Sequence, residues 1–354
     1  MTTVDPSRRW TTNRRAFLAG LAGAAAGVAF RGAHAVGAAR REVRVGGRRV
    51  RVIDGHAHCA IPEAAPTGTV ANGLVMTPER LTQMDADGID VQVLSINPFW
   101  YAADRDAARR LIDVQNERLA ALCAAHPDRF VALATVALQY PDLAADQLEH
   151  AVKALGMRGV AIGGSVAGEE LAAPKFDPFW AKAEALEALV FIHPQGFGEI
   201  RGRVQGNGFL GNVIGNPLET TVALSHLIFE GTLDRFPRLR ICAAHGGGFL
   251  PSYAGRFDRG CLTFPANCTG KNQKPPSAYL KQLYFDSLVF TAEGLRHLVA
   301  ECGAGQIVLG TDYPYPWTST AVDHVLGTPG LSDADKRAIL GGTLARLLHI
   351  GSVS

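Results

Sequence analysis

Short apolar runs of strand length alternate along this chain with longer stretches that carry apolar residues at helical spacing. The first run ends at Asp54, and later runs lie at 90–96, 130–136, 159–164, 188–193, 239–245, 283–288 and 306–312. Helical spacing follows several of these runs, as over 106–125 and 142–155. The pattern therefore predicts eight strand–helix units, with two short helices at the C-terminal end.

The strand-like runs are apolar throughout rather than alternating. Burial on both faces is typical of a parallel sheet wrapped by helices, and eight such units favour a (β/α)8 TIM barrel, an α/β fold. A doubly wound open sheet is the alternative, but no GxGxxG motif follows the first strand. Before the barrel, "EVRVGGRRVRVID" alternates valine with charge around Gly46 and Gly47, which predicts a short β-hairpin extension.

The N-terminal segment, residues 1–35, has a different character. A basic stretch ends at Arg14 and Arg15, an apolar run of about 15 residues follows, and Ala33-His34-Ala35 fits a cleavage site. The run is shorter than the roughly 20 residues of a membrane-spanning helix, although an uncleaved anchor is the alternative. The pattern "NRRAFLAG" is typical of a twin-arginine signal peptide, which predicts export to the periplasm or beyond. No linker rich in proline, serine or glycine lies between residues 50 and 350, so we expect one domain over 36–354.

Composition narrows the functional classes. Apolar residues make up 47% of the 354 residues and charged residues 19%, which is enough for a large core. Loss of residues 1–35 removes five arginines and one aspartate, which changes the formal net charge from +2 to −2. Neither a nucleic-acid partner nor a further membrane span is expected. Among six cysteines, Cys261 and Cys268 are the first candidates for a disulfide.

Four histidines and one aspartate stand at the ends of the predicted strands. His56 and His58 follow the first strand, and His193, His245 and Asp312 end later ones. The carboxyl ends of all barrel strands meet at one mouth, so these five side chains are expected to lie together. His56 and His58 are two positions apart in an extended segment, which points both imidazoles the same way.

Each of these residues alone also fits a structural role, since strand-end histidines are often buried hydrogen-bonding residues and Asp312 can cap a helix. Their conjunction predicts a site for one divalent metal held by His56, His58, His193 and Asp312. Zinc is the ion that this ligand set favours, with manganese as the alternative. His245 is then free as an acid–base, or to orient a water whose pKa zinc lowers towards about 7.

The sequence resembles the amidohydrolase superfamily, in the branch of aminocarboxymuconate semialdehyde decarboxylase and related metal-dependent decarboxylases. "DGHAH", "FIHPQ", "RICAAHGGGFLPSYAGRFDRG" and "IVLGTDYPYPW" carry the resemblance, which runs from about residue 50 to 349. It implies the same four metal ligands, with His245 and Asp312 as catalytic residues. It also implies that Arg256 reaches a neighbouring subunit's substrate, and hence a homodimer.

The sequence departs from that decarboxylase around the substrate. Residues 59–79 contain no lysine or arginine where the family has a substrate-binding arginine, and Gln195 replaces a tryptophan. Arg201 and Arg203 are candidates to substitute for the missing arginine. Trp100, between Phe99 and Tyr101, is a candidate to line a ring pocket, although such a cluster is also typical of ordinary packing.

Three functions are consistent with these residues. The first is a non-oxidative decarboxylase of a small aromatic or unsaturated carboxylic acid, with metal-bound water or hydroxide and His245 as the acid–base. The second is a hydrolase of a lactone, ester or amide that uses the same site. The third is a non-catalytic metal-binding or partner-binding protein, which the complete set of site residues disfavours. The family branch favours the decarboxylase, acting on a small-molecule substrate.

Overall fold

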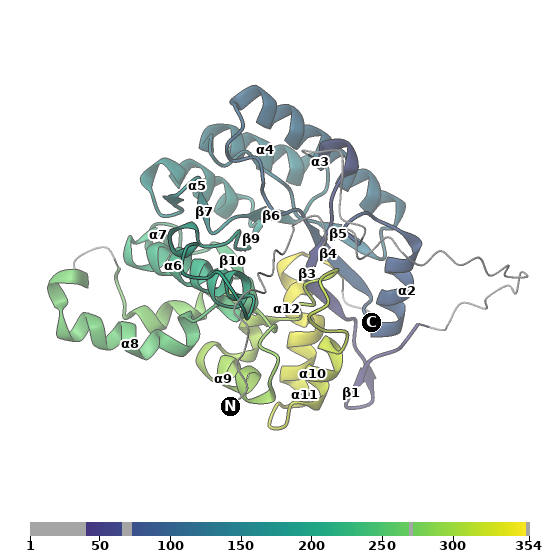
Figure 1. The fold of residues 1–354 in the computed structure, drawn as a ribbon. Helices are drawn as coiled ribbons and strands as arrows, with labels where there is room; N and C mark the ends of the chain where they lie inside the picture. Colours follow the sequence, from purple (N-terminus) through teal and green to yellow (C-terminus); the bar gives the residue numbers. More distant parts are fainter. Residues whose placement is uncertain (1–39, 66–72, 269–271, 352–354) are drawn as a thin grey trace, which may run out of the picture. The chain divides into compact units, whose positions relative to one another are not determined.

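Eight parallel strands form the centre of the computed structural model, which describes residues 40–65, 73–268 and 272–351 (Figure 1). The predicted signal peptide, residues 1–35, lies outside the described residues. The strands are β3 (Ile53–His58), β4 (Val91–Ser95), β5 (Phe130–Ala132), β6 (Gly159–Ile162), β9 (Leu189–Ile192), β10 (Arg240–Ala243), β11 (Leu283–Asp286) and β12 (Ile307–Val308).

These strands follow one another in sequence order. β3, β4 and β5 form one sheet, and β6, β9, β10, β11 and β12 form a second. Single parallel bridges join the two sheets, from Ala134 to Val160 beside β5 and β6, and from Ala57 to Tyr313 beside β3 and β12. Each strand thus has both sequence neighbours beside it, with the last next to the first, which is the arrangement of the predicted (β/α)8 barrel.

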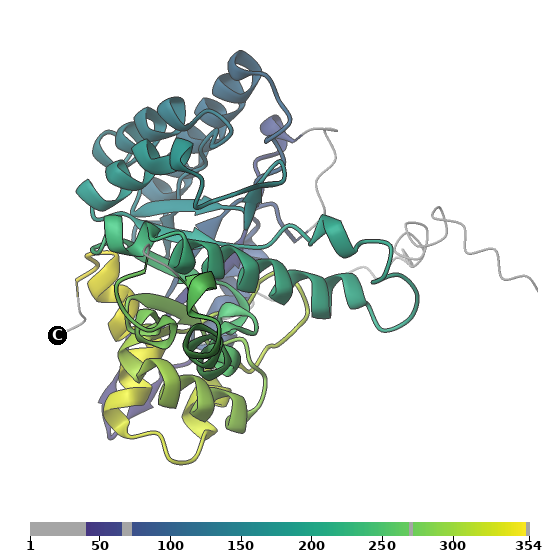
Figure 2. The same ribbon diagram turned by 90° about the vertical axis from the view of Figure 1, so that its left-hand side faces the viewer.

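Helices surround the strands on the outside (Figures 1 and 2). The larger helices are α2 (Pro78–Asp87), α3 (Arg105–Ala125), α4 (Pro141–Lys153), α5 (Asp177–Ala185), α6 (Asn216–Phe229), α8 (Leu250–Thr263) and α9 (Ala292–Cys302). Short elements complete the fold: β7 (Ser165–Val166), β8 (Glu169–Glu170), α7 (Thr232–Arg235), α10 (Ala321–Gly327), α11 (Asp333–Arg337) and α12 (Thr343–Leu347).

The two short helices expected at the C-terminal end are α10 and a continuous helix over 333–347, in which the π-helical segment Ala338–Gly342 joins α11 to α12. Helix α2 was not assigned to particular residues, because its ten residues include only two large apolar side chains, Leu81 and Met84. This helix buries Met84 together with the charged Arg80, and a buried arginine breaks the apolar periodicity on which helix prediction depends.

The apolar strands divide their side chains between two clusters. Alternate residues such as Val91 and Val93 of β4 point into the barrel, where Leu344 and Leu347 of α12 pack against them. The intervening residues, such as Val190 of β9, join the larger cluster between strands and helices. Burial on both faces thus explains the continuous apolar runs in the sequence.

The N-terminal hairpin is confirmed. β1 (Arg44–Val45) pairs antiparallel with β2 (Arg48–Arg49), and Gly46 and Gly47 make the turn with φ values of 59° and 77°. Both values lie in the left-handed region, which glycine adopts without a steric penalty.

The cysteines fall into two groups. Cys261 and Cys268, the pair suggested by the sequence, form a disulfide that links the end of α8 to the following turn. Burial raises the pKa of Cys59 to about 11 and that of Cys302 to about 12, so these thiols stay protonated and unreactive. Among the described residues, no helix is both long and apolar enough to cross a membrane.

Three glycines shape the turn between β10 and α8. Gly246, Gly247 and Gly248 all have positive φ, and His245 before them has a φ of 56°. A Cβ atom on Gly248 would lie 2.1 Å from the backbone oxygen of Pro217 at the start of α6. The turn therefore needs glycine at position 248 both for its backbone conformation and for the close approach of α6.

We expect Gly248→Ala to destabilise the protein much more than Gly156→Ala. Gly156 has a similar φ of 70° but no atom within 4 Å of the added Cβ, so its substitution costs only the left-handed strain of about 1 kcal/mol. The clash at Gly248 adds about 1–3 kcal/mol of overpacking. Urea unfolding of both variants measures the difference, and equal midpoints would contradict the close packing of α6 against this turn.

Candidate metal centre

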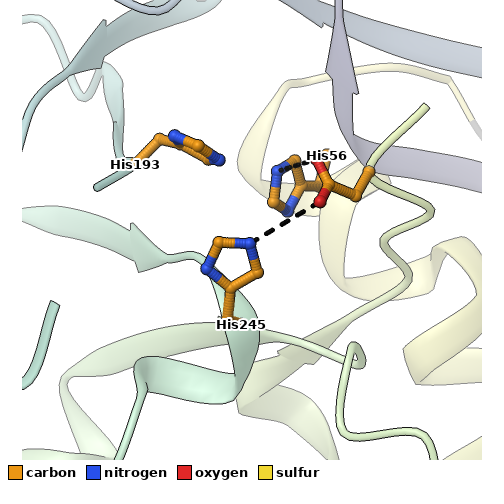
Figure 3. A group of neighbouring side chains, drawn as sticks. His56, His193 and His245 are labelled. Carbon is orange, nitrogen blue, oxygen red and sulfur yellow. Dashed lines mark ion pairs between the residues drawn. The ribbon is translucent and has the colours of Figure 1, made fainter. Parts of the chain in front are cut away.

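The five predicted site residues come together at the carboxyl ends of the strands. His56 and His58 lie on β3, while His193, His245 and Asp312 follow β9, β10 and β12. Figure 3 shows the imidazoles of His56, His193 and His245 turned towards one another. His56, His58, His193 and Asp312 are buried, and the side chain of His245 is 17% exposed. The prediction that these side chains share one mouth of the barrel is therefore confirmed.

The distances suit a single small ion. Ligand atoms of His56, His193, His245 and Asp312 all lie within 4.8 Å of one another. His58 belongs to the same cluster, because its Nε2 lies 3.0 Å from Nε2 of His56 and 2.9 Å from Oδ1 of Asp312. The structure thus brings both His58 and His245 into the cluster, and the geometry alone does not decide which of them is the third imidazole ligand and which is the free histidine.

Asp286 is a site residue that the sequence analysis missed. Its Oδ2 lies 2.7 Å from Nδ1 of His56, and it also accepts hydrogen bonds from the backbone N–H groups of His245 and Gly246. Carboxylates in this position fix the tautomer of a metal-binding histidine, so that Nε2 of His56 presents its lone pair to the cluster. Asp286 is the last residue of β11, and that strand-end position was the available signal.

The buried histidines of the cluster have strongly shifted pKa values, in opposite directions. Burial alone would lower the pKa of His56, but the charges of Asp312 and Asp286 raise it to about 10. Burial lowers the pKa of His58 to about 4. Burial and the neighbouring imidazoles of His58 and His56 hold the pKa of His193 well below its usual range. Two histidines are therefore neutral, as metal binding requires, and one holds a proton that two carboxylates attract.

The residues present fit a divalent metal. Nε2 of His56, Nε2 of His58 and Oδ1 of Asp312 lie within 3.2 Å of one another, as expected of donor atoms directed at one ion. Burial would raise the pKa of Asp312, but the charge of His56 and hydrogen bonds from His245 and His56 hold it well below its usual range. An ionised carboxylate surrounded by imidazoles is a donor set typical of divalent transition metals.

A buried polar network holds the first and last strands in register below the cluster. Asp54 accepts hydrogen bonds from Oγ1 of Thr311 at 2.6 Å and from Nε2 of Gln92 at 3.0 Å. Arg80 of α2 donates to Gln92 and to the carbonyl oxygen of His58, both at 2.8 Å. Burial raises the pKa of Asp54 to about 6. The network therefore supports the backbone that carries His56, His58 and Asp312.

Two site residues have strained backbones. His245 and Asp312 have φ values of 56° and 59°, in the left-handed region that side chains other than glycine rarely adopt. The N–H of Asp312 donates to the carbonyl oxygen of His56 at 2.9 Å, which holds this conformation in place. Backbone strain of this kind persists only where the surrounding structure compensates for it, and it is found most often at functional sites.

A cavity of about 630 Å³ opens beside the cluster. His245 and Asp312 line it, together with apolar residues that include Leu288, Val289 and Phe290. A cavity of this size accommodates a small organic molecule, with His245 and Asp312 directly at its wall.

The predicted substrate-binding residues lie elsewhere in this chain. Trp100 is buried in the core, where its indole N–H donates to the carbonyl oxygen of Val136. Its position agrees with ordinary packing, the alternative to lining a ring pocket. Gln195 and Arg201 line a separate cavity of about 280 Å³, and Arg203 lines neither cavity. Arg256 is exposed on α8 and does not line either cavity. Substrate binding by Trp100, Gln195 and Arg256 thus stays a prediction.

Glu219 was also missed, and it explains the position of Gln195. Oε2 of Glu219 accepts hydrogen bonds from the N–H groups of Gln195 and Gly196, at 2.8 and 2.6 Å. This carboxylate in α6 therefore fixes the turn that follows His193. Burial raises the pKa of Glu219 to about 7, although the two N–H groups lower it. Its place within a helix gave no sign of this role.

Comparison with known proteins agrees with this geometry. The chain is 33% identical over 275 residues to 2-amino-3-carboxymuconate-6-semialdehyde decarboxylase of Dictyostelium discoideum, which covers 77% of this chain and 76% of that one. It is 32% identical over 289 residues to gamma-resorcylate decarboxylase of a Rhizobium species, which covers 76% of this chain and 85% of that one.

A solved structure shows the same fold with a metal. The dihydroxybenzoic acid decarboxylase of a Polaromonas species, solved with bound manganese and the inhibitor 2-nitroresorcinol, superposes with a TM-score of 0.75 at 26% identity. The match covers 85% of this chain and 97% of that one. The sequence model of the amidohydrolase family matches residues 53–350. This protein therefore belongs to the amidohydrolase family.

Proposed function

We propose that this protein is a metal-dependent, non-oxidative decarboxylase of a small aromatic or unsaturated carboxylic acid. The observation that carries the proposal is the position of His245 and Asp312, which belong to the His/Asp cluster and also line the large cavity. Two relatives named decarboxylases match most of the chain in sequence, and the Polaromonas decarboxylase has this fold.

In this proposal His56, His58, His193 and Asp312 hold one divalent ion. We favour zinc for its preference for imidazole ligands, and manganese, which the Polaromonas structure contains, is the alternative. Such an ion supplies positive charge that binds and polarises the carboxylate of a substrate. Asp286 orients His56 for this purpose through its 2.7 Å contact with Nδ1.

His245 and Asp312 then manage the proton. Decarboxylation breaks the bond between the carboxyl group and the adjacent carbon, which keeps the electron pair and must receive a proton. His245 lies at the cavity wall and donates that proton, so the carboxylate and one proton become carbon dioxide and a C–H bond. Oδ2 of Asp312 lies 3.7 Å from Nε2 of His245 and orients the imidazole.

A hydrolase of lactones, esters or amides would use the same residues. The names of the relatives favour decarboxylation, and an assay that records carbon dioxide and acid release separately distinguishes the two reactions.

We expect His245→Ala to lower the rate of carbon dioxide release by about 10²–10⁴-fold, because the acid–base group is lost. Metal content should stay near one ion per chain, since four other ligands remain. His226→Ala is the matched control, because His226 is a partly exposed histidine of α6 outside the cluster. Release that continues at the wild-type rate in His245→Ala would remove His245 from the mechanism.

Asp286→Asn should weaken metal affinity by about 10–100-fold, because an amide holds the Nδ1–H of His56 less strongly than a carboxylate. Competition with a chelator measures the affinity, and circular dichroism checks that the variant is folded. Asp142→Asn provides a control, since Asp142 is an exposed carboxylate paired with Arg105 on the surface. Unchanged affinity in folded Asp286→Asn would contradict the role assigned to this carboxylate.

We also propose that the protein forms a homodimer through α8. Arg256 is exposed on this helix, beside the exposed apolar side chains of Tyr253 and Leu262 and the nearby Phe264. An apolar surface of this kind, with a charge next to it, is typical of a protein interface, and a second copy would cover it.

Finally, we propose that residues 1–35 direct the protein out of the cytoplasm by twin-arginine export. The disulfide between Cys261 and Cys268 supports this proposal, because disulfides persist in oxidising compartments and are rare in the cytoplasm.

Replacement of Arg14 and Arg15 by lysine should therefore keep the full-length precursor in the cytoplasm, with Cys261 and Cys268 reduced. The wild-type protein should be recovered from the periplasm, oxidised and beginning at residue 36. Mass spectrometry of alkylated peptides measures both the N-terminus and the thiol state. Equal export of wild type and variant would rule out the twin-arginine route.

A further inference from the structure

Three exposed aromatic side chains gather at the cavity that His245 and Asp312 line. Trp317 stacks on Phe209 with ring centroids 6.2 Å apart and contacts Phe290 at 6.0 Å. They come from three loops, after β9, β11 and β12. Phe290 and Trp317 line the cavity directly. We call Phe209, Phe290 and Trp317 the aromatic rim.

The rim has two features that packing alone does not explain. Its rings stay exposed, at 66% for Phe209, 53% for Phe290 and 36% for Trp317, although water contact with such large apolar surfaces is unfavourable. Phe209 and Phe290 also have φ values of 54° and 59°, which bulky side chains rarely adopt. Exposed apolar surface on strained loops beside a cavity is typical of a ligand-binding surface.

Outside the His/Asp cluster, His297 is the one ionisable side chain among the described residues that line the cavity. Leu288, Val289 and Leu298 form apolar wall, and Asn212, Asn216 and Ser252 contribute neutral polar groups. Among the described residues no lysine or arginine lines this cavity. A negative charge on the substrate is therefore compensated at the His/Asp cluster and its ion. The rim offers no cation to a second carboxylate, and contact with its apolar rings would remove water from that carboxylate without compensation.

We propose that the site selects aromatic monocarboxylic acids whose ring carries an uncharged apolar substituent opposite the carboxylate, and that it discriminates against dicarboxylic acids. The inference rests on the proposed function, since it places the carboxylate at the His/Asp cluster. The ring then fills the cavity, and the substituent lies on the aromatic rim, where Trp317 is its main contact.

Binding to the metal-loaded mature protein tests this selectivity. Suitable probes are 2-hydroxybenzoate, its 4-propyl derivative and its 4-carboxy derivative, which differ only opposite the carboxylate. We expect the propyl compound to bind at least 10-fold more tightly than the parent and the dicarboxylate at least 10-fold more weakly, as measured by calorimetry. Trp317 fluorescence should change on binding, because Trp100 and Trp180 are buried.

Two variants locate the effect. Trp317→Ala should weaken binding of the propyl compound at least 10-fold more than binding of the parent, and Trp317→Phe should retain the advantage of the propyl compound. Val213→Arg adds a cation to the cavity wall, from a residue that is exposed, and should improve binding of the dicarboxylate at least 10-fold.

The proposal is overturned if the three probes bind equally or not at all, or if Trp317→Ala weakens all of them alike. Tight dicarboxylate binding that is lost in Arg256→Ala would also overturn it, because Arg256 would then supply the second charge. Carbon dioxide release is recorded in parallel. Selective binding without release from any probe would contradict the decarboxylase function while leaving the selectivity of the cavity established.

Discussion

The backbone pairing between β3 and the segment after β12 is the constraint on which the site depends. The N–H of His58 donates to Tyr313 at 2.6 Å, and the N–H of Asp312 donates to His56 at 2.9 Å. These bonds join parts of the chain about 250 residues apart, and they place the carboxylate of Asp312 between His56 and His58. Without this pairing His58 would lose the carboxylate of Asp312, and His56 would keep only that of Asp286.

The buried charges at the metal cluster must be compensated by the groups around them. Three buried imidazoles and two buried carboxylates, those of Asp312 and Asp286, occupy one small volume, and buried charge is costly unless it is compensated. The charges of Asp312 and Asp286 raise the pKa of His56 to about 10, although burial alone would lower it. A divalent cation held by these residues would compensate both carboxylates, so metal binding would also stabilise the folded protein.

The strand ends could be predicted from the sequence because they depend on local patterns. Apolar runs locate the strands, and a polar residue that terminates such a run must lie at the mouth of the barrel. Asp286 ends a strand by the same rule, but its role as the partner of His56 depends on a distant contact, as does that of Glu219 at the turn of Gln195. The residues of helix α2 were not assigned, although eight strand–helix units require a helix there, because it buries Arg80, whose partners Gln92 and His58 are visible only in three dimensions.

The residues of the cavity wall are a different case, because loops of irregular conformation carry several of them. Trp100 and Trp317 are both tryptophans shortly after a barrel strand, yet Trp100 turns into the core and Trp317 lines the cavity. The loops that carry Phe209 and Phe290, whose rings contact Trp317, have positive φ values at these two residues, a conformation that side chains other than glycine rarely adopt. Because local sequence does not encode these loop conformations, a barrel can retain one metal cluster while its loops change the substrate.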